Sequence, residues 1–188
     1  MSFEEIKKSI LWKMEHLDKS NKKSIDEKIR GLCEKINEKE GYATTSSCSG
    51  RISIVKHKDT KSPNAWVFKS HEKIKVEDLL NLDLPDDLTL LKMESAILHV
   101  ACETIESAKK LLNLARLCGF KRSGIISIKS NKNVVEILST ENLAVPFSKK
   151  KKRLVSKELL QLCVNLANEK LDKTHRKIDK LEKAIEQI

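Results

Sequence analysis

Residues 42–54 read Tyr-Ala-Thr-Thr-Ser-Ser-Cys-Ser-Gly-Arg-Ile-Ser-Ile, and no other stretch of the chain is as informative. We expect its first part to be a polar loop, because serine and threonine bury little apolar surface. The β-branched residues that follow predict a strand over residues 51–55. The hydroxyl and backbone donors of the loop favour a carboxylate, a phosphate or another small polar ligand, and a hydrogen-bonded turn is the alternative.

The composition is typical of a globular protein. Of the 188 residues, 39% are hydrophobic and 34% are charged, and no segment is apolar enough to cross a membrane. The five cysteines are scattered and form no Cys-x-x-Cys pair, so we predict neither a disulfide framework nor a zinc finger. We therefore expect a cytoplasmic protein, because the cytoplasm keeps free thiols reduced.

The chain is strongly basic, with a net charge of +10 and an isoelectric point near 9.3. This charge favours acidic partners, of which nucleic acid is the commonest. A lysine-rich surface without a specific partner is the alternative interpretation.

Helical and strand patterns alternate along the chain and predict an α+β fold. We expect a mixed β-sheet core with packed helices and a long C-terminal helix. A standard Rossmann cofactor site is not indicated, because the chain has no Gly-x-Gly-x-x-Gly motif. We predict helices over residues 3–17, 24–40, 75–82, 107–118 and 156–188, strands over 51–55, 64–70, 96–102, 124–129 and 134–139, and a polar connector over 142–152.

Three helix boundaries have recognisable signals. Ser24 and Glu27 have the spacing of a capping box, and Gly41 and Gly119 follow helical patterns as C-terminal caps. We predict a single domain over residues 1–188. Two intertwined subdomains, over about 1–95 and 96–155, followed by the helix 156–188, are the alternative organisation.

Several side chains are candidates for binding or chemistry. Arg51 lies where the loop meets the strand, and its guanidinium can hold a carboxylate or a phosphate through two parallel bonds. Trp66 can stack on a base or an adenine ring, with core packing as the alternative. His71 ends the same predicted strand. His99 lies inside an apolar strand, where a hydrogen-bonded core residue is the alternative.

Two other features give weaker signals. Cys48, His71 and Cys102 have the residue types of a metal site, but no close ligand spacing supports one, and we predict no bound metal. The basic run over residues 149–153 is interpreted as a solvated charge run that could also hold phosphates.

Seven short blocks of the chain occur in the order typical of one family. The blocks cover residues 24–27, 44–51, 66–71, 98–102, 119–125, 139–140 and 145–148. On these blocks the chain resembles the family of the third wybutosine-synthesising enzyme of tRNA, which includes archaeal proteins. The resemblance runs from about Phe3 into the C-terminal helix. One departure is that residues 56–65 contain no glycine, where family members often have a glycine-rich stretch before the tryptophan.

The resemblance implies a tRNA methyltransferase that uses S-adenosyl-L-methionine and does not have a standard Rossmann fold. Its implied substrate is the tricyclic wybutosine precursor, aminocarboxypropyl-demethylwyosine, next to the anticodon of phenylalanine tRNA, and it methylates a ring nitrogen. The alternative is a non-enzymatic basic RNA-binding module. A weaker alternative is a coiled-coil assembly protein that uses the seven-residue repeat of Leu171, Ile178 and Ile185.

The resemblance also implies which residues form the active centre, and we expect them to line one pocket. By this implication the catalytic residues are His71, Cys48 and Ser47. The cofactor-binding residues are Ser46, Ser47, Gly50, Arg51, Trp66, His99, Ser123 and Gly124. Cys102 and Arg122 match further blocks. We hypothesise that His71 is the base and that Ser47 and Arg51 hold a carboxylate.

Overall fold

The computed structural model describes residues 2–16, 25–57 and 65–188. The predicted α+β class is confirmed, since the fold has two antiparallel sheets with packed helices and a long C-terminal helix. Among the helices of the described residues, none is both long and apolar enough to span a membrane.

The chain forms two compact units, each built from separate stretches of sequence. Unit 1 comprises Met1–Ser49, Ala96–Thr140 and His175–Ile188, and unit 2 comprises Gly50–Ser95 and Glu141–Thr174. These boundaries differ from the suggested subdomains over 1–95 and 96–155. That the whole chain acts as one domain stays a prediction.

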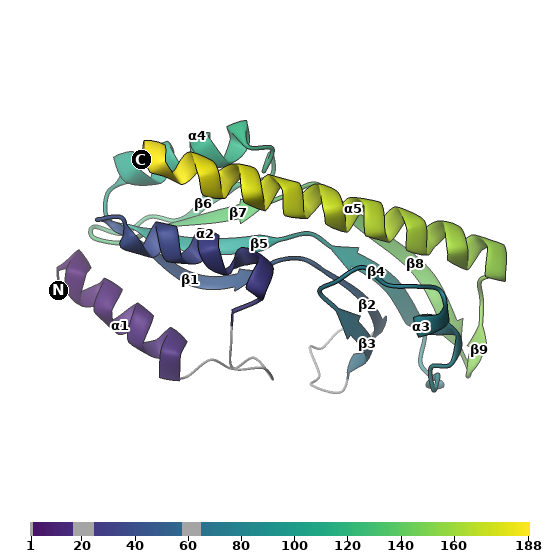
Figure 1. Cartoon of the computed structure of the whole chain (residues 1–188). Helices are drawn as coiled ribbons and strands as arrows, with labels where there is room; N and C mark the ends of the chain where they lie inside the picture. Colours follow the sequence, from purple (N-terminus) through teal and green to yellow (C-terminus); the bar gives the residue numbers. More distant parts are fainter. Residues whose placement is uncertain (1, 17–24, 58–64) are drawn as a thin grey trace. The chain divides into compact units, whose positions relative to one another are not determined.

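Unit 1 contains a four-stranded sheet with strand order β1-β5-β7-β6 (Figure 1). Its elements are α1 (Phe3–His16), α2 (Glu27–Glu38), β1 (Tyr42–Cys48), β5 (Ile97–Cys102), α4 (Ile105–Leu117), β6 (Gly124–Ser127), β7 (Asn133–Leu138), the last turns of α5 (Lys157–Ala184) and the 3-10 helix η2 (Ile185–Gln187). One face of the sheet packs on α2, α4 and the end of α5. Ala43 and Ala101 on the other face pack against Phe3 of α1.

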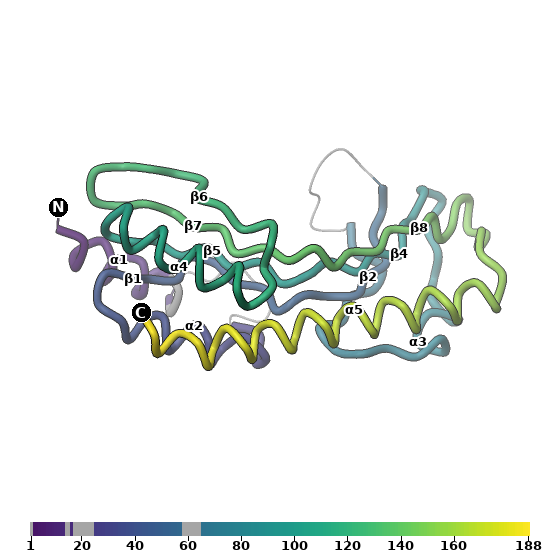
Figure 2. Tube along the Cα trace, turned by 90° about the horizontal axis from the view of Figure 1, so that it is seen from above, coloured from purple at the N-terminus to yellow at the C-terminus, as the bar shows by residue number. Residues whose placement is uncertain are grey.

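Unit 2 contains a five-stranded sheet with strand order β3-β2-β4-β8-β9, and β2, β4 and β8 run alongside one another in Figure 2. Its elements are β2 (Arg51–Lys56), β3 (Trp66–Ser70), α3 (Glu77–Leu80), β4 (Thr89–Glu94), β8 (Asn142–Lys149), β9 (Lys152–Arg153) and the first turns of α5. Ile52, Ile54, Leu91 and Met93 alternate toward one face, where they pack against α3 and α5. The other residues of these strands point to the opposite face.

One predicted loop and one predicted connector are wrong, and one strand was missed. Residues 42–48 are not a loop but the edge strand β1, in which the side chain of Asn37 accepts hydrogen bonds from the backbone N–H and the hydroxyl of Thr44. The predicted connector 142–152 contains β8 and the first residue of β9, and β4 was not predicted at all. Residues 42–48 can form a strand without a continuous apolar pattern because β1 lies at the edge of its sheet.

The helix ends agree in part with their sequence signals. Gly119 (φ 101°) follows α4, and the N–H groups of Gly119 and Phe120 donate to the carbonyls of Arg116 and Ala115, which is a Schellman motif. Gly41 (φ 75°) does not cap α2, because the helix ends at Glu38 with Lys39 as its cap. The predicted capping box at Ser24 lies outside the described residues.

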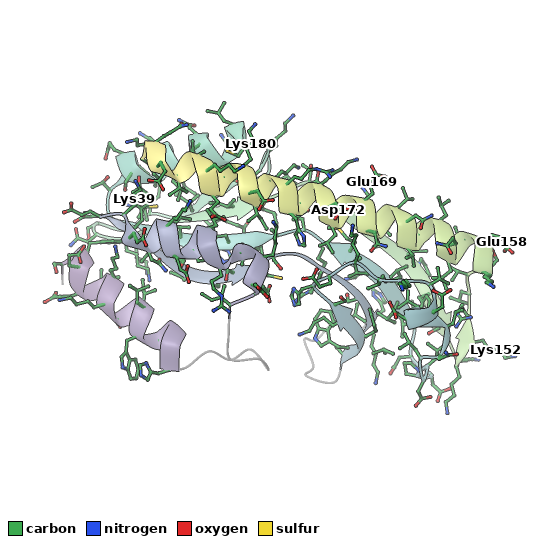
Figure 3. All side chains as sticks on the ribbon, viewed as in Figure 1. Lys39, Lys152, Glu158, Glu169, Asp172 and Lys180 are labelled. Atoms are coloured by element: carbon green, nitrogen blue, oxygen red, sulfur yellow. The ribbon has the colours of Figure 1, made fainter. Side chains whose placement is uncertain are left out.

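The predicted C-terminal helix is confirmed as α5, and its residues contribute to the cores of both units. Leu171 is buried in the core of unit 2, whereas Ile178 and Ile185 are buried in unit 1. The seven-residue repeat therefore packs within the chain and leaves no apolar seam of these residues for a coiled coil. Charged side chains such as Glu158 and Glu169 are exposed along the helix (Figure 3).

Candidate functional site

A row of polar side chains crosses the sheet of unit 1 on the face that also meets α1. The cross-strand register places Ser46 opposite His99, His99 opposite Glu136, and Glu136 opposite Gly124. Ser46 Oγ lies 2.7 Å from His99 Nδ1, and His99 Nε2 lies 3.1 Å from Glu136 Oε1. Residues from three neighbouring strands thus form one hydrogen-bonded row, which Gly124 of the fourth strand adjoins.

The hydrogen bonds of this row define the state of the imidazole. A carboxylate can only accept, so His99 Nε2–H donates to Glu136. In the neutral ring Nδ1 then carries no proton and accepts from the Ser46 hydroxyl. The row therefore holds the imidazole in one orientation and in one tautomer.

Ser46 and Ser47 point to opposite faces of β1, as successive strand residues do. Ser47 lies opposite Leu98 on the core face, where its hydroxyl hydrogen-bonds the thiol of Cys33. Burial raises the pKa of Cys33 to about 11, and the bond from Ser47 only partly opposes this effect. The two serines of the predicted motif therefore do not line the same side of the sheet.

Cys48 ends β1 on the same face as Ser46 and is only half-buried, whereas the other four cysteines are buried. The next residue, Ser49, donates from its backbone N–H and its hydroxyl to the carboxylate of Asp26, at 2.9 and 3.1 Å. Asp26 is also the N-cap residue of α2. It thereby ties the end of the serine-rich strand to the start of that helix.

Ser123 has a structural role in the turn before β6. Its hydroxyl donates to the Phe120 carbonyl at 2.7 Å and accepts from the Leu138 N–H at 3.0 Å. Both functions of this buried hydroxyl are therefore used within unit 1. Cofactor binding by Ser123 and Gly124 stays a prediction, and Gly124 is the better placed because it lies beside the row with His99.

In unit 2 the predicted site residues gather at the start of β2. Arg51 Nε donates to Glu94 Oε2 at 2.7 Å, and its guanidinium carbon lies 4.5 Å from the centre of the Trp66 ring. The carboxylate and the ring fix the guanidinium between them, and the Nη edge is the part suited to a ligand carboxylate or phosphate. Trp66 is 38% exposed, so it is a surface platform and not a core residue.

His71 follows β3 and is fixed by the backbone. Its Nδ1 lies 2.9 Å from the carbonyl oxygen of Gly50, and a carbonyl can only accept. Nδ1 therefore carries the proton, and Nε2 is the basic nitrogen of the neutral ring. Gly50 itself adopts a φ of 98°, a conformation that favours glycine and aims this carbonyl.

Most of the thiols are buried in the core, including that of Cys102. Burial raises the pKa of Cys102 to about 12, and the pKa values of Cys118 and Cys163 are also raised by burial. Such thiols stay protonated near neutral pH and are poor nucleophiles and poor metal ligands. Cys102 therefore serves packing.

A family model described as methyltransferase TYW3 matches residues 5–187. The chain belongs to this methyltransferase family. The match spans nearly the whole sequence, so it covers both units. It confirms the resemblance carried by the short sequence blocks.

Individual members of the family are similar over almost their full length. A relative from Thermococcus sibiricus is 41% identical over 175 residues, which cover 91% of this chain and 89% of the relative. A relative from Pyrococcus abyssi is 39% identical over 192 residues, which cover 100% and 97%. Both are named tRNA(Phe) 7-((3-amino-3-carboxypropyl)-4-demethylwyosine(37)-N(4))-methyltransferase, the second with the suffix 1.

The fold is also shared with a solved structure. The PH1069 protein from Pyrococcus horikoshii has a TM-score of 0.89 and 37% identity, covering 98% of this chain and 96% of that one. Membership of the TYW3 family makes the chain an enzyme that needs a methyl donor. It does not support the alternative of a non-enzymatic RNA-binding module.

Two acidic residues of the site were not predicted, Glu94 and Glu136. Each lies on a strand, and each is placed beside its partner by the pairing of strands that are far apart in sequence. The alternation of residues 133–138 shows that Glu136 points away from the core, but only the β5–β7 register shows that it meets His99. That the groups of both units line one pocket stays a prediction.

Proposed function

We propose that this member of the TYW3 family transfers a methyl group from S-adenosyl-L-methionine to a ring nitrogen of aminocarboxypropyl-demethylwyosine, next to the anticodon of phenylalanine tRNA. The observation that carries the proposal is the full-length match to relatives named for this reaction. The net charge of +10 suits a polyanionic substrate. The five free cysteines suit a reducing cytoplasm.

The residues of unit 2 fit a ligand that has both a carboxylate and a flat ring, as this donor has. Arg51 is fixed at Nε by Glu94, which leaves its Nη edge to bind a carboxylate through two parallel bonds. The exposed ring of Trp66 suits a purine. The substrate arm also ends in a carboxylate, so Arg51 fits either partner of the reaction.

The chemistry requires alignment and the removal of one proton. When bound, the donor supplies an electrophilic methyl group on a positively charged sulfur. The acceptor nitrogen must present a lone pair, and His71 accepts its proton at Nε2, because Nδ1–H is held by the Gly50 carbonyl. Fixed orientation of both reactants supplies most of the remaining rate enhancement.

The role of Arg51 is tested by calorimetric titration with S-adenosylhomocysteine. We expect the wild-type chain to bind it saturably, which a plain RNA-binding module would not do. Arg51→Ala should weaken the affinity at least about tenfold, since it removes a charge-assisted pair of bonds. Lys56→Ala removes a cation from the same strand, where Lys56 pairs with Asp87, and is the matched control.

Methyl transfer and ligand affinities that are unchanged in Arg51→Ala would exclude the assignment of Arg51. A wild-type chain that binds tRNA but takes up no S-adenosylhomocysteine would contradict the proposed function itself.

A further inference from the structure

The face of the unit 2 sheet that points away from α3 and α5 carries a row of polar residues. The register of β3, β2, β4 and β8 places Lys69, Ser53, Lys92 and Ala144 side by side. The core-facing neighbours Ile52 and Ile54 point the other way. We call the four residues placed side by side the Lys69–Lys92 row. Only Lys69 lies within one of the sequence blocks that define the family resemblance, the block 66–71.

The centre of the row is a buried hydroxyl. Ser53 has no exposed surface, and within residues 2–16, 25–57 and 65–188 its Oγ has no hydrogen-bond partner. Buried polar groups in proteins are nearly always paired, so an orphaned hydroxyl calls for an explanation. A ligand oxygen that approaches between the two lysines would provide the missing partner.

Among the residues that the structure describes, no carboxylate forms an ion pair with either lysine. Other basic residues of unit 2 form ion pairs, as Lys56 does with Asp87 and Lys73 with Asp172. In the described part of the chain, Lys69 and Lys92 form none. The acidic residue on this face nearest in register is Glu94, and its carboxylate is paired with Arg51. The row therefore presents two cations around a hydroxyl.

An aromatic platform adjoins the row. Trp66 lies three residues before Lys69 on β3, and it is exposed while Arg51 stacks on its ring. The residues of β8 on this face, Asn142, Ala144 and Pro146, are exposed as well. The row therefore lies on an open sheet face beside the proposed donor-binding residues Arg51 and Trp66, and its cations suit the phosphate backbone of a nucleic acid.

We propose that the Lys69–Lys92 row binds the phosphate backbone of single-stranded RNA, namely the nucleotides that flank the base to be methylated. The inference rests on the proposed function, because it takes tRNA as the substrate. Lys69 and Lys92 lie two strand spacings apart, about 10 Å, so their long side chains reach the same phosphate or two neighbouring ones. Ser53 donates its hydroxyl to a phosphate oxygen that approaches between the two lysines.

The test compares two double variants that remove the same charge. Lys69→Gln with Lys92→Gln alters the row, whereas Lys75→Gln with Lys157→Gln alters two exposed lysines in segments that adjoin the opposite face. The affinity for phenylalanine tRNA is measured for each as a function of salt concentration. S-adenosylhomocysteine affinity is measured in parallel.

We expect the row variant to bind tRNA about tenfold more weakly near 0.1 M salt, and its salt slope to fall by about 1.4, because each phosphate that is no longer neutralised lowers the slope by about 0.7. The control pair should change affinity less than about twofold. Ser53→Ala should weaken binding severalfold without changing the slope, because a neutral hydroxyl releases no counterion. S-adenosylhomocysteine affinity should be unchanged in all variants.

Equal decreases of affinity in the row variant and the control pair would overturn the inference, because they would indicate only a general charge effect. A second outcome would also overturn the inference. In it, millimolar inorganic phosphate inhibits tRNA binding by the wild type but not by the row variant, while both proteins have the same salt slope for tRNA. The row would then bind free phosphate and not the RNA backbone. If the wild type methylates tRNA and the row variant binds like wild type, this inference fails and the proposed function stands.

Discussion

His71 is held by a backbone carbonyl in the tautomer that leaves Nε2 as the basic nitrogen. Replacing His71 with Ala should lower the rate of methyl transfer about 100-fold, which is a typical decrease for a general base. The affinities for S-adenosylhomocysteine and tRNA should change little. Single-turnover kinetics with saturating enzyme measure the rate, and a normal rate in His71→Ala across neutral pH would exclude the base role.

Ser53 and Ser123 are both buried, but their hydroxyls differ in hydrogen bonding. Ser123 has two backbone partners, whereas the hydroxyl of Ser53 has none among the described residues. Ser53→Ala should therefore raise the free energy of unfolding by about 1 kcal/mol, and Ser123→Ala should lower it by about 1–3 kcal/mol.

Urea denaturation of the two serine variants measures this difference, and each is the control for the other. A decrease of stability in Ser53→Ala as large as that in Ser123→Ala would mean that the Ser53 hydroxyl is satisfied in the free protein. Ser53 would then have no role as an orphaned donor for a ligand.

The turn between β8 and β9 shows how an element can carry local strain. Lys150 and Lys151 have φ values of 49° and 59°, the conformation of a two-residue hairpin turn that favours Asn-Gly. Their N–H groups donate to the carbonyls of Asp86 and Pro85 and would still do so after substitution. Lys150→Asn with Lys151→Gly should raise the free energy of unfolding by about 1 kcal/mol.

The matched control for the turn is Lys149→Gln with Lys152→Gln. These residues flank the turn as a cross-strand pair, so the variant removes the same charge without relieving the backbone. Thermal unfolding measures the stability of both variants. An increase of stability in the control as large as that in the turn variant would assign the effect to charge repulsion and not to backbone strain.

Elements with a clear apolar period could be predicted from the sequence. The alternation around Ile52, Ile54, Leu98 and Val100 indicated the right strands, and the helical stripe before Gly119 indicated α4. Strand β1 was mistaken for a loop, because Thr44, Thr45, Ser46 and Ser47 form no apolar alternation. Only Thr44 among them is buried and Ser46 is exposed, so the strand is defined by its pairing with β5. Strand β8 was missed because Pro146 argues against a strand. It is tolerated here because it lies at the register shift beside Leu90, in a part of β8 that β9 does not pair with.

The candidate site could be predicted only in part, because the contacts between its residues depend on which strands pair. The sequence blocks include Ser46 and His99, which the structure places in contact. Their partner Glu136 and the Arg51 partner Glu94 depend on strand pairing over 37 and 43 residues of sequence, which local patterns do not specify. The opposite orientation of Ser46 and Ser47 became clear only once residues 42–48 were known to form a strand.

Buried thiols and a buried phenol link the stability of the whole protein to pH. Burial raises the pKa of Cys33 from 9.0 to about 11, that of Cys102 from 9.0 to about 12, and that of Tyr42 from 10.0 to about 12. The unfolded chain therefore releases these protons at a lower pH than the folded chain. Ionisation favours the unfolded state, so stability is complete below about pH 9 and decreases as the pH rises above it.

We expect each of the two thiols to lower the free energy of unfolding by about 1 kcal/mol between pH 8 and pH 10. Urea denaturation across this range measures the decrease. In Cys33→Ala, the free energy of unfolding should decrease less between pH 8 and pH 10 than in the wild type, and the difference should equal the contribution of one thiol. If the free energy of unfolding decreases as steeply with pH in Cys33→Ala as in the wild type, Cys33 has the same pKa in the folded and the unfolded chain.

The proposed reaction is methylation of a ring nitrogen of the wybutosine precursor in phenylalanine tRNA. The most direct measurement incubates the chain with S-adenosyl-L-methionine and with tRNA that carries aminocarboxypropyl-demethylwyosine, and analyses the digested nucleosides by mass spectrometry. We expect the precursor to increase in mass by one methyl group in place of a hydrogen, on the tricyclic base. Saturable binding of both substrates with no mass increase in the base, or a methyl group on another nucleoside, would contradict it.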